Sequence, residues 1–228
     1  MRELILVAGT KASSKTVTTK NKIADIKNRN ILIFDVNMEY NDFEILPVSK
    51  IAEFSKSKDF KTKRIVPITR GKNMSLQQIG KLVVKILSQF NNGVLVLESI
   101  GGYAPMNKKI YDMILSGNKK QKERLTIICI FQSISSIPRL IYNKSASLRL
   151  HYTCDGVDRC RGVKHFEILK IANLIVTNKF KEGDRFFHCT INRWETIFGN
   201  FDKQDYRNAC LDYVNSERGL YRYCELFK

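Results

Sequence analysis

The sequence predicts an α/β fold in which a mainly parallel sheet is flanked by helices. Short apolar runs of strand length alternate with longer segments in which apolar residues recur at helical spacing. The runs are apolar throughout, which is typical of strands that are buried on both faces of a parallel sheet. The chain has 228 residues, enough for one domain with a sizeable core.

The elements of the first half follow from these patterns. Residues 4–8 form the first apolar strand, and a loop and a polar helix follow it to about residue 27. Residues 31–34 form a second strand that ends at Asp35. A helical stripe over residues 74–90, capped by Ser75, stops at the Asn-Asn-Gly of residues 91–93. Residues 55–63, rich in Lys and Ser, are the one segment that resembles a linker.

The second half continues the alternation. A third strand over residues 94–97 ends at Glu98, a helix covers residues 105–115, and a fourth strand over residues 126–131 ends at Gln132. Further elements are a strand at 147–151, a helix at 163–174 and a strand at 185–191. We therefore expect one domain over residues 1–195 and a basic, aromatic, helical tail over residues 196–228. The polar strand ends matter, because parallel sheets bind ligands at the carboxyl ends of their strands.

The loop after the first strand has the spacing of a phosphate-binding loop. It matches G-x-x-x-x-G-K-[ST], except that Ser14 replaces the second glycine. In such a loop the backbone N–H groups surround the phosphates, Lys15 reaches the outer phosphates, and Thr16 holds Mg²⁺. Glycine is favoured where the backbone bends close to a ligand, so Ser14 places the affinity for ATP in question. The alternative is a connecting loop that binds nothing. The nucleotide-binding candidates are Gly9, Thr10, Lys11, Ala12, Ser13, Ser14, Lys15 and Thr16.

Nucleotide hydrolysis also needs carboxylates at a neighbouring strand end, one for the metal and one to orient the attacking water. Glu98 supplies one, as a metal ligand or as the catalytic acid. The next residue is Ser99, which is no general base near neutral pH. Whichever of the two roles Glu98 takes, the carboxylate for the other role is missing. The simpler alternative is that Glu98 is a solvated acid at a strand end.

The features after the fourth strand have a recognisable order. Gln132 ends that strand, Arg149 lies on the next strand, and Arg159 follows in a turn after Asp155. Residues 33–40 add a strand-end Asp followed by a Glu-Tyr pair. Together these motifs resemble the FtsK/HerA group of P-loop motors, which includes viral DNA-packaging ATPases, over residues 3–165.

The resemblance implies roles for three of these residues. Gln132 would sense the outer phosphate, and Arg149 or Arg159 would reach the ATP of a neighbouring subunit as an arginine finger. Such a finger implies a homo-oligomeric ring, a hexamer in this group, and viral capsid or portal proteins become candidate partners. The alternative is that both arginines face solvent, pair with acids or bind nucleic acid.

The charge of the chain favours a polyanionic partner. Lys and Arg number 39 against 22 Asp and Glu, a formal net charge of +17. DNA, bound through its phosphates, is the leading partner. No apolar stretch approaches the length of a membrane-spanning helix, and we expect no membrane partner. Three basic clusters lie over residues 11–27, over residues 56–72, and over residues 108–124, where ring motors of this group present pore loops.

The combined interpretation is an ATPase that binds ATP and Mg²⁺ and translocates DNA or packages a genome, in the host cytoplasm or in a virion. Two alternatives stay open. The first is a catalytically inactive relative that serves as a nucleic-acid-binding or structural subunit, which Ser14 and Ser99 favour. The second is an assembly ATPase of the filamentous-phage type, for which a transmembrane helix would be the expected support.

Overall fold

In the computed structural model, which describes residues 2–69, 71–116, 124–160, 162–192 and 195–216, the described strands form one large sheet and one small hairpin. The large sheet has nine strands in the order β11-β10-β9-β1-β8-β7-β2-β4-β3. The predicted mainly parallel sheet is confirmed, since only the pairings of β10 with β9 and β11 are antiparallel. The strands are β1 (Arg2–Ala8), β2 (Ile31–Phe34), β3 (Glu44–Ile45), β4 (Thr62–Ile65), β7 (Gly93–Leu97), β8 (Leu125–Phe131), β9 (Ser147–His151), β10 (His188–Asn192) and β11 (Thr196–Phe198). The separate hairpin joins β5 (Ile68–Thr69) to β6 (Lys72–Asn73).

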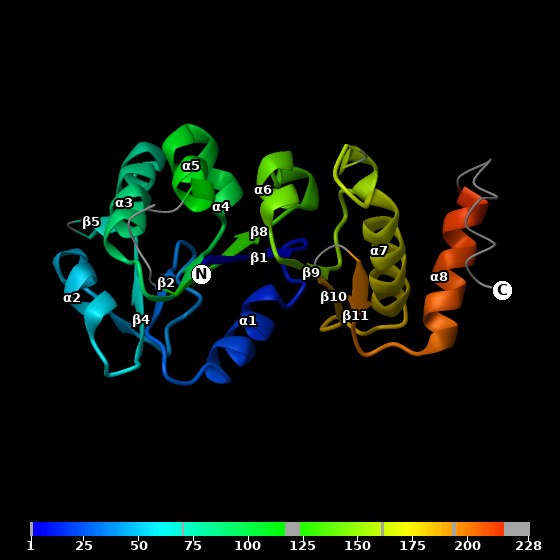
Figure 1. Cartoon of the computed structure of the whole chain (residues 1–228), viewed down its shortest axis with the longest axis horizontal. Helices are drawn as coiled ribbons and strands as arrows, with labels where there is room; N and C mark the ends of the chain where they lie inside the picture. The colour runs from blue at the N-terminus through cyan, green and yellow to red at the C-terminus, as the bar shows by residue number, and fades with distance from the viewer. Residues whose placement is uncertain (1, 70, 117–123, 161, 193–194, 217–228) are drawn as a thin grey trace.

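Helices cover the two faces of the sheet unequally. Helices α3 and α5 lie above the sheet in Figure 1 and α1 lies below it. The larger core contains buried residues of α2, α3, α5, α6 and α7, whereas the smaller core joins Ile23 of α1 and Tyr40 to the other face of β1, β2, β7 and β8. The helices are α1 (Lys15–Ala24), α2 (Ile51–Lys56), α3 (Leu76–Gln89), α4 (Ile100–Tyr103), α5 (Lys108–Ser116), α6 (Arg139–Lys144), α7 (Phe166–Lys181) and α8 (Lys203–Ser216).

Local chemistry explains where α3 begins. Ser75 is its N-cap: the Ser75 hydroxyl accepts the Gln78 N–H at 3.3 Å, and the Gln78 side chain accepts the Ser75 N–H at 2.8 Å. This reciprocal pair satisfies two backbone donors that the helix leaves unpaired. The predicted cap is therefore confirmed.

Some predicted boundaries were wrong. The segment 55–63 is no linker: Ser55 is buried in α2, its hydroxyl accepts the Asn91 N–H at 3.0 Å, and β4 begins at residue 62. The helix predicted over 105–115 corresponds to α5, which begins only at Lys108, because Pro105 lies in a 3₁₀ turn over Ala104–Met106 between α4 and α5.

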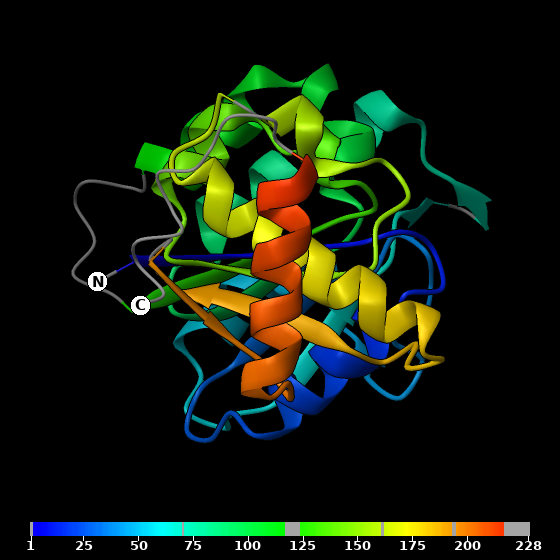
Figure 2. The same cartoon turned by 90° about the vertical axis from the view of Figure 1, so that its right-hand side faces the viewer.

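Residues 196–216 of the predicted helical tail pack against the domain and begin with a strand, and residues 217–228 lie outside the described residues. Residue 196 begins β11, which pairs with β10 and extends the main sheet. Helix α8 follows and lies across α7 (Figure 2). Lys179 of α7 and Asp205 of α8 form an ion pair at 2.8 Å, and the ammonium of Lys170 lies 5.5 Å from the ring of Tyr213.

Candidate functional site

The loop between β1 and α1 adopts a tight turn with two residues in the left-handed region. Ala12 has φ 64° and Ser14 has φ 61° and ψ 15°. Glycine takes this conformation without steric cost, and other residues do so at about 1–2 kcal/mol. Ser14 therefore adopts the kind of backbone conformation for which the glycine of the motif is suited. The Ser14 hydroxyl donates a 3.0 Å hydrogen bond to the Arg185 carbonyl.

The base of the loop packs against the end of β9. The Thr10 N–H donates to the Tyr152 carbonyl at 2.8 Å. A Cβ at Gly9 would lie 2.7 Å from the Cβ of His151 and 3.0 Å from the Tyr152 carbonyl oxygen, so a side chain does not fit there. His151 is fully buried, and its Nε2 lies 3.2 Å from the Thr18 hydroxyl. Burial lowers the pKa of His151 to about 3 and keeps its ring neutral.

Lys15 occupies the centre of the loop. Its ammonium donates to the Thr10 carbonyl at 2.5 Å and lies 3.4 Å from the Ser13 hydroxyl. Burial lowers the pKa of Lys15 to about 8, and the carboxylates of Glu39 and Glu98 partly oppose that shift. A polyphosphate in the loop would restore a full charge to this amine, because an anion favours its protonated form.

Thr16 is hydrogen-bonded to Glu39, which lies in the turn after β2. Its hydroxyl donates to the Glu39 carboxylate. The turn that carries Glu39 is held by Asp35, whose carboxylate accepts the Glu39 N–H at 2.9 Å and the Tyr40 N–H at 3.1 Å. Asp35 is fully buried and paired with Arg64 of β4 at 2.8 Å. Asp35 is thus a structural residue that positions Glu39.

The ends of β7 and β8 supply the other polar groups. Glu98 is buried and accepts the Asn37 N–H at 3.2 Å. Burial raises the pKa of the Glu98 carboxyl to about 7, although the hydrogen bond from the Asn37 backbone opposes the shift. The Ser99 hydroxyl accepts two 3.1 Å hydrogen bonds, from the side chains of Asn37 and Gln132. Ser99 therefore links the polar ends of neighbouring strands.

These groups meet in one cleft of about 360 Å³. Strand β8 lies between β1 and β7, so Gln132 stands between the phosphate loop and Glu98. The lining includes eight of the predicted residues: Lys11, Ala12, Ser13, Ser14, Lys15, Thr16, Glu98 and Gln132. Gly9 and Thr10 form the base of the loop and are not part of that lining.

The two predicted arginines lie elsewhere. The guanidinium of Arg149 donates to the Thr18 carbonyl of α1 at 3.1 Å, within the same subunit. Arg159 is exposed on the 3₁₀ turn Val157–Cys160. Neither residue lines the cleft.

Glu39 and Phe186 line the cleft, although the sequence did not predict either as a site residue. Glu39 belongs to the motif after β2, and its approach to Thr16 depends on the turn that Asp35 holds. Phe186 lies in the loop between α7 and β10. No local pattern marked Phe186, because its neighbours at the site come from the other end of the chain.

The donor set of the cleft fits Mg²⁺, which prefers oxygen ligands and keeps several waters. Thr16 supplies a hydroxyl, and Glu39 and Glu98 supply carboxylates, to the lining of the cleft. Because the Thr16 hydroxyl donates its proton to Glu39, its lone pairs are free to face a cation.

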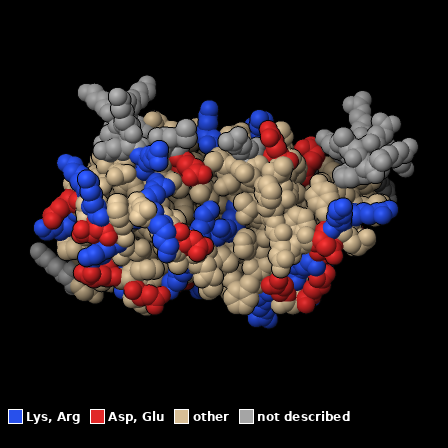
Figure 3. Space-filling view, turned by 60° about the horizontal axis from the view of Figure 1, so that its bottom comes forward, with Lys and Arg blue, Asp and Glu red and all other residues tan. Residues whose placement is uncertain are grey.

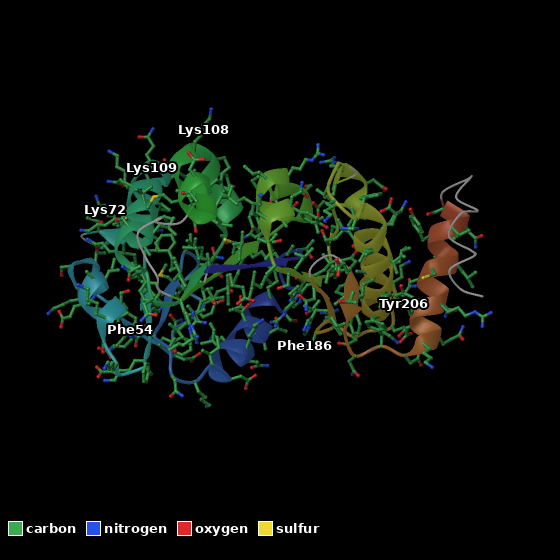
Figure 4. The ribbon with its side chains drawn as sticks, in the orientation of Figure 1. Phe54, Lys72, Lys108, Lys109, Phe186 and Tyr206 are labelled. Carbon is green, nitrogen blue, oxygen red and sulfur yellow. The ribbon has the colours of Figure 1, made fainter. Side chains whose placement is uncertain are left out.

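The basic surfaces differ in how far acids neutralise them. On the face that carries α1, Lys and Arg side chains are interspersed with Asp and Glu (Figure 3), as in the Lys20–Asp42 pair at 2.6 Å. Lys72, Lys108 and Lys109 lie on the opposite side, near α3 and α5 (Figure 4), and within the described ranges none of them is in an ion pair with another side chain. Arg70 and the predicted pore-loop residues Lys119, Lys120 and Lys122 lie outside the described residues.

A phosphate loop between β1 and α1, with a buried strand-end acid one strand beyond β8, defines the fold of a P-loop NTPase. Among solved structures, the chain is similar to the genome packaging NTPase B204 of Sulfolobus turreted icosahedral virus 2 in complex with AMPPCP. The TM-score is 0.61 at 15% identity, over 87% of this chain and 96% of that one. The DNA-packaging ATPase B204 of Sulfolobus turreted icosahedral virus gives a TM-score of 0.55 at 15% identity, over 86% and 96%.

At these identities the comparison shows a shared fold. No family model matches the sequence, and no curated protein matches it either. The resemblance to the FtsK/HerA group therefore stays a prediction. Within the described part of the chain, no helix combines the length and the apolar character that crossing a membrane requires.

Proposed function

We propose that this chain is an ATPase that binds ATP with Mg²⁺ and moves or packages DNA. The observation that carries the proposal is the single cleft that joins Lys15 and Thr16 of the phosphate loop to Glu98 and Gln132 at the strand ends. Further support comes from the fold shared with B204, which has been solved with AMPPCP and with ATP-gammaS.

The residues of the loop bind the phosphates in this proposal. The backbone N–H groups at the start of α1 would surround the phosphates, and Lys15 would leave its contact with the Thr10 carbonyl to pair with the outer phosphates. Bound Mg²⁺ would neutralise charge on the phosphate oxygens. Thr16 and Glu98 would hold it.

Glu39 supplies the carboxylate that position 99 lacks. It is exposed in the cleft, whereas Glu98 is buried and carries a raised pKa. A positioned carboxylate that takes the proton of the attacking water contributes about 10²–10⁴-fold to a rate. Gln132, held by Ser99, would orient that water by hydrogen bonding.

DNA binding is proposed for the side of the molecule that carries Lys72, Lys108 and Lys109. Among the described residues these cations have no acidic partner, so no ion pair with a described residue has to be broken before they contact phosphates. Binding of this kind is independent of base sequence and weakens as salt is added.

We also propose that the chain forms a homo-oligomeric ring on DNA. Arg159 is a better candidate than Arg149 for the arginine finger of such a ring, because the guanidinium of Arg149 is hydrogen-bonded to α1.

The test is ATP turnover with and without duplex DNA. We expect DNA to raise the rate in the wild type, Lys15→Ala to abolish turnover, and the double variant Lys108→Ala/Lys109→Ala to keep basal turnover but lose most of the stimulation. Lys50→Ala is the matched control, since Lys50 is paired with Glu53. Turnover that equals the Lys15→Ala background in all conditions would refute the ATPase.

The alternative of an inactive relative rests on one observation, that Ser99 stands where a catalytic acid is expected. It predicts nucleotide binding without turnover. Calorimetry that shows micromolar ATP binding by a wild type with no hydrolysis would favour it over the motor.

A further inference from the structure

A second cavity, of about 430 Å³, adjoins the phosphate cleft on the side of β10 and β11. Phe186 lines both cavities, and Phe198 of β11 lines the second. The two rings are 62% and 55% exposed, so their faces are accessible to a ligand. Figure 4 places Phe186 between α1 and the strands β10 and β11.

Three contacts hold the loop that carries Phe186 in place. The Asp184 carboxylate accepts the Phe186 N–H at 3.0 Å, and the next residue, Phe187, is buried in the core. The Arg185 carbonyl accepts the hydrogen bond from Ser14 in the phosphate loop. The backbone that carries Phe186 is therefore held next to the loop that would bind the phosphates.

The second cavity combines an aromatic wall with a few polar groups. Besides Phe186 and Phe198, its lining includes Thr190 and Asn200, whose side chains can donate and accept hydrogen bonds. Binding sites for flat heterocycles have this composition, with apolar walls and a few placed polar groups. The cavity shares Phe186 with the phosphate cleft, so one ligand that carries both a polyphosphate and a heterocycle can occupy both.

We propose that this second cavity is the nucleobase subsite of the proposed ATPase and that the base stacks on Phe186. The inference rests on the proposed nucleotide binding. Stacking uses the face that every base possesses, so Phe186 contributes to the binding of ATP and GTP alike. Phe198 forms the far side of the subsite.

The experiment compares ATP with inorganic tripolyphosphate, which lacks the base, by calorimetry in the presence of Mg²⁺. We expect Phe186→Ala to weaken ATP and GTP binding by about 5- to 100-fold, the usual range for loss of one base–aromatic stack, and to leave tripolyphosphate binding unchanged. Phe186→Tyr retains a ring and should restore ATP affinity. Phe60→Ala is the matched control, because Phe60 is 49% exposed in the turn before β4 and lines neither cavity.

A direct readout uses Phe186→Trp. We expect its fluorescence to be quenched by ATP and not by tripolyphosphate. Equal ATP affinity in the wild type and Phe186→Ala would overturn the subsite and leave nucleotide binding intact. An equal loss for ATP and tripolyphosphate would show instead that Phe186 supports the phosphate loop, and would also overturn it. A wild type that binds neither compound would refute the proposed function itself.

Discussion

Replacing Ser14 by glycine tests whether the phosphate loop is formed before any nucleotide arrives. In the structure Ser14 is in the left-handed region, with φ 61° and ψ 15°, and its hydroxyl is bound to the Arg185 carbonyl. If this conformation is present both before and after binding, its cost is the same in the two states. The substitution then changes stability through several opposing terms but leaves the binding free energy almost untouched.

The contributions of Ser14→Gly to the free energy of unfolding are of similar size. Glycine relieves about 1–2 kcal/mol of left-handed strain. It forfeits a hydrogen bond worth about 0.5–1.5 kcal/mol and adds about 0.4–1 kcal/mol of chain entropy to the unfolded state. The free energy of unfolding should therefore change by less than about 1 kcal/mol. The affinity for ATP should change by less than about fivefold, which corresponds to 1 kcal/mol.

The assay is calorimetric titration with ATP and Mg²⁺, together with urea denaturation, on the wild type, Ser14→Gly and Ser14→Ala. Alanine keeps the left-handed strain and loses the hydrogen bond, so it should be less stable than the wild type by about 1 kcal/mol. A gain of more than tenfold in ATP affinity for Ser14→Gly would refute the reasoning, because it would show that serine holds the free loop in a different conformation.

Three further predictions follow from single contacts. Glu39→Gln should lower single-turnover ATP hydrolysis by about 10²–10⁴-fold and leave ATP affinity nearly unchanged, and an unaltered rate would exclude Glu39 as the base. His151 has a pKa near 3 in the fold against an ordinary value of 6.5, so the unfolded chain binds the extra proton and stability falls as the pH drops below about 6.5. By pH 4.5 the loss should reach about 3 kcal/mol in urea denaturation, at about 1.4 kcal/mol per pH unit, and His151→Gln should flatten this dependence. Asp35→Ala leaves Arg64 without its partner and should cost about 3–5 kcal/mol, whereas Asp42→Ala, at an exposed pair with Lys20, should cost under about 1 kcal/mol by the same measurement.

The central strands could be predicted from the sequence because burial on both faces makes them apolar throughout. Strands β2 and β9 have the predicted bounds, residues 31–34 and 147–151. The edge strand β3 and its neighbour β4 were missed for the converse reason. Both residues of β3 are exposed, and β4 carries Lys63, which pairs with Glu44 of β3. Basic residues within a strand near the sheet edge give the sequence the same polar character as a solvated linker.

The phosphate loop could be predicted because all its residues are neighbours in the chain. Glu39 and Phe186 could not, since both reach the cleft through contacts between distant segments: Asp35 with Arg64 in one case, and Ser14 with Arg185 in the other. For Arg149 the sequence predicted the place in the sheet but not the contact of the side chain. Its position on β9 matched the prediction, but only the fold reveals that α1 binds its side chain.

The neighbours of β1 in the sheet have a consequence for the order of folding. Strand β1 leaves the ribosome before the other described strands, yet within the described residues it pairs only with β8 and β9, which begin at residues 125 and 147. Until those residues have been synthesised, the most N-terminal apolar strand has two unpaired edges, which are prone to aggregation. Contacts so distant in sequence also slow folding, because a long loop must close before they form. Strand β1 is therefore made long before it can reach its native place, and nascent chains are vulnerable until β9 has emerged.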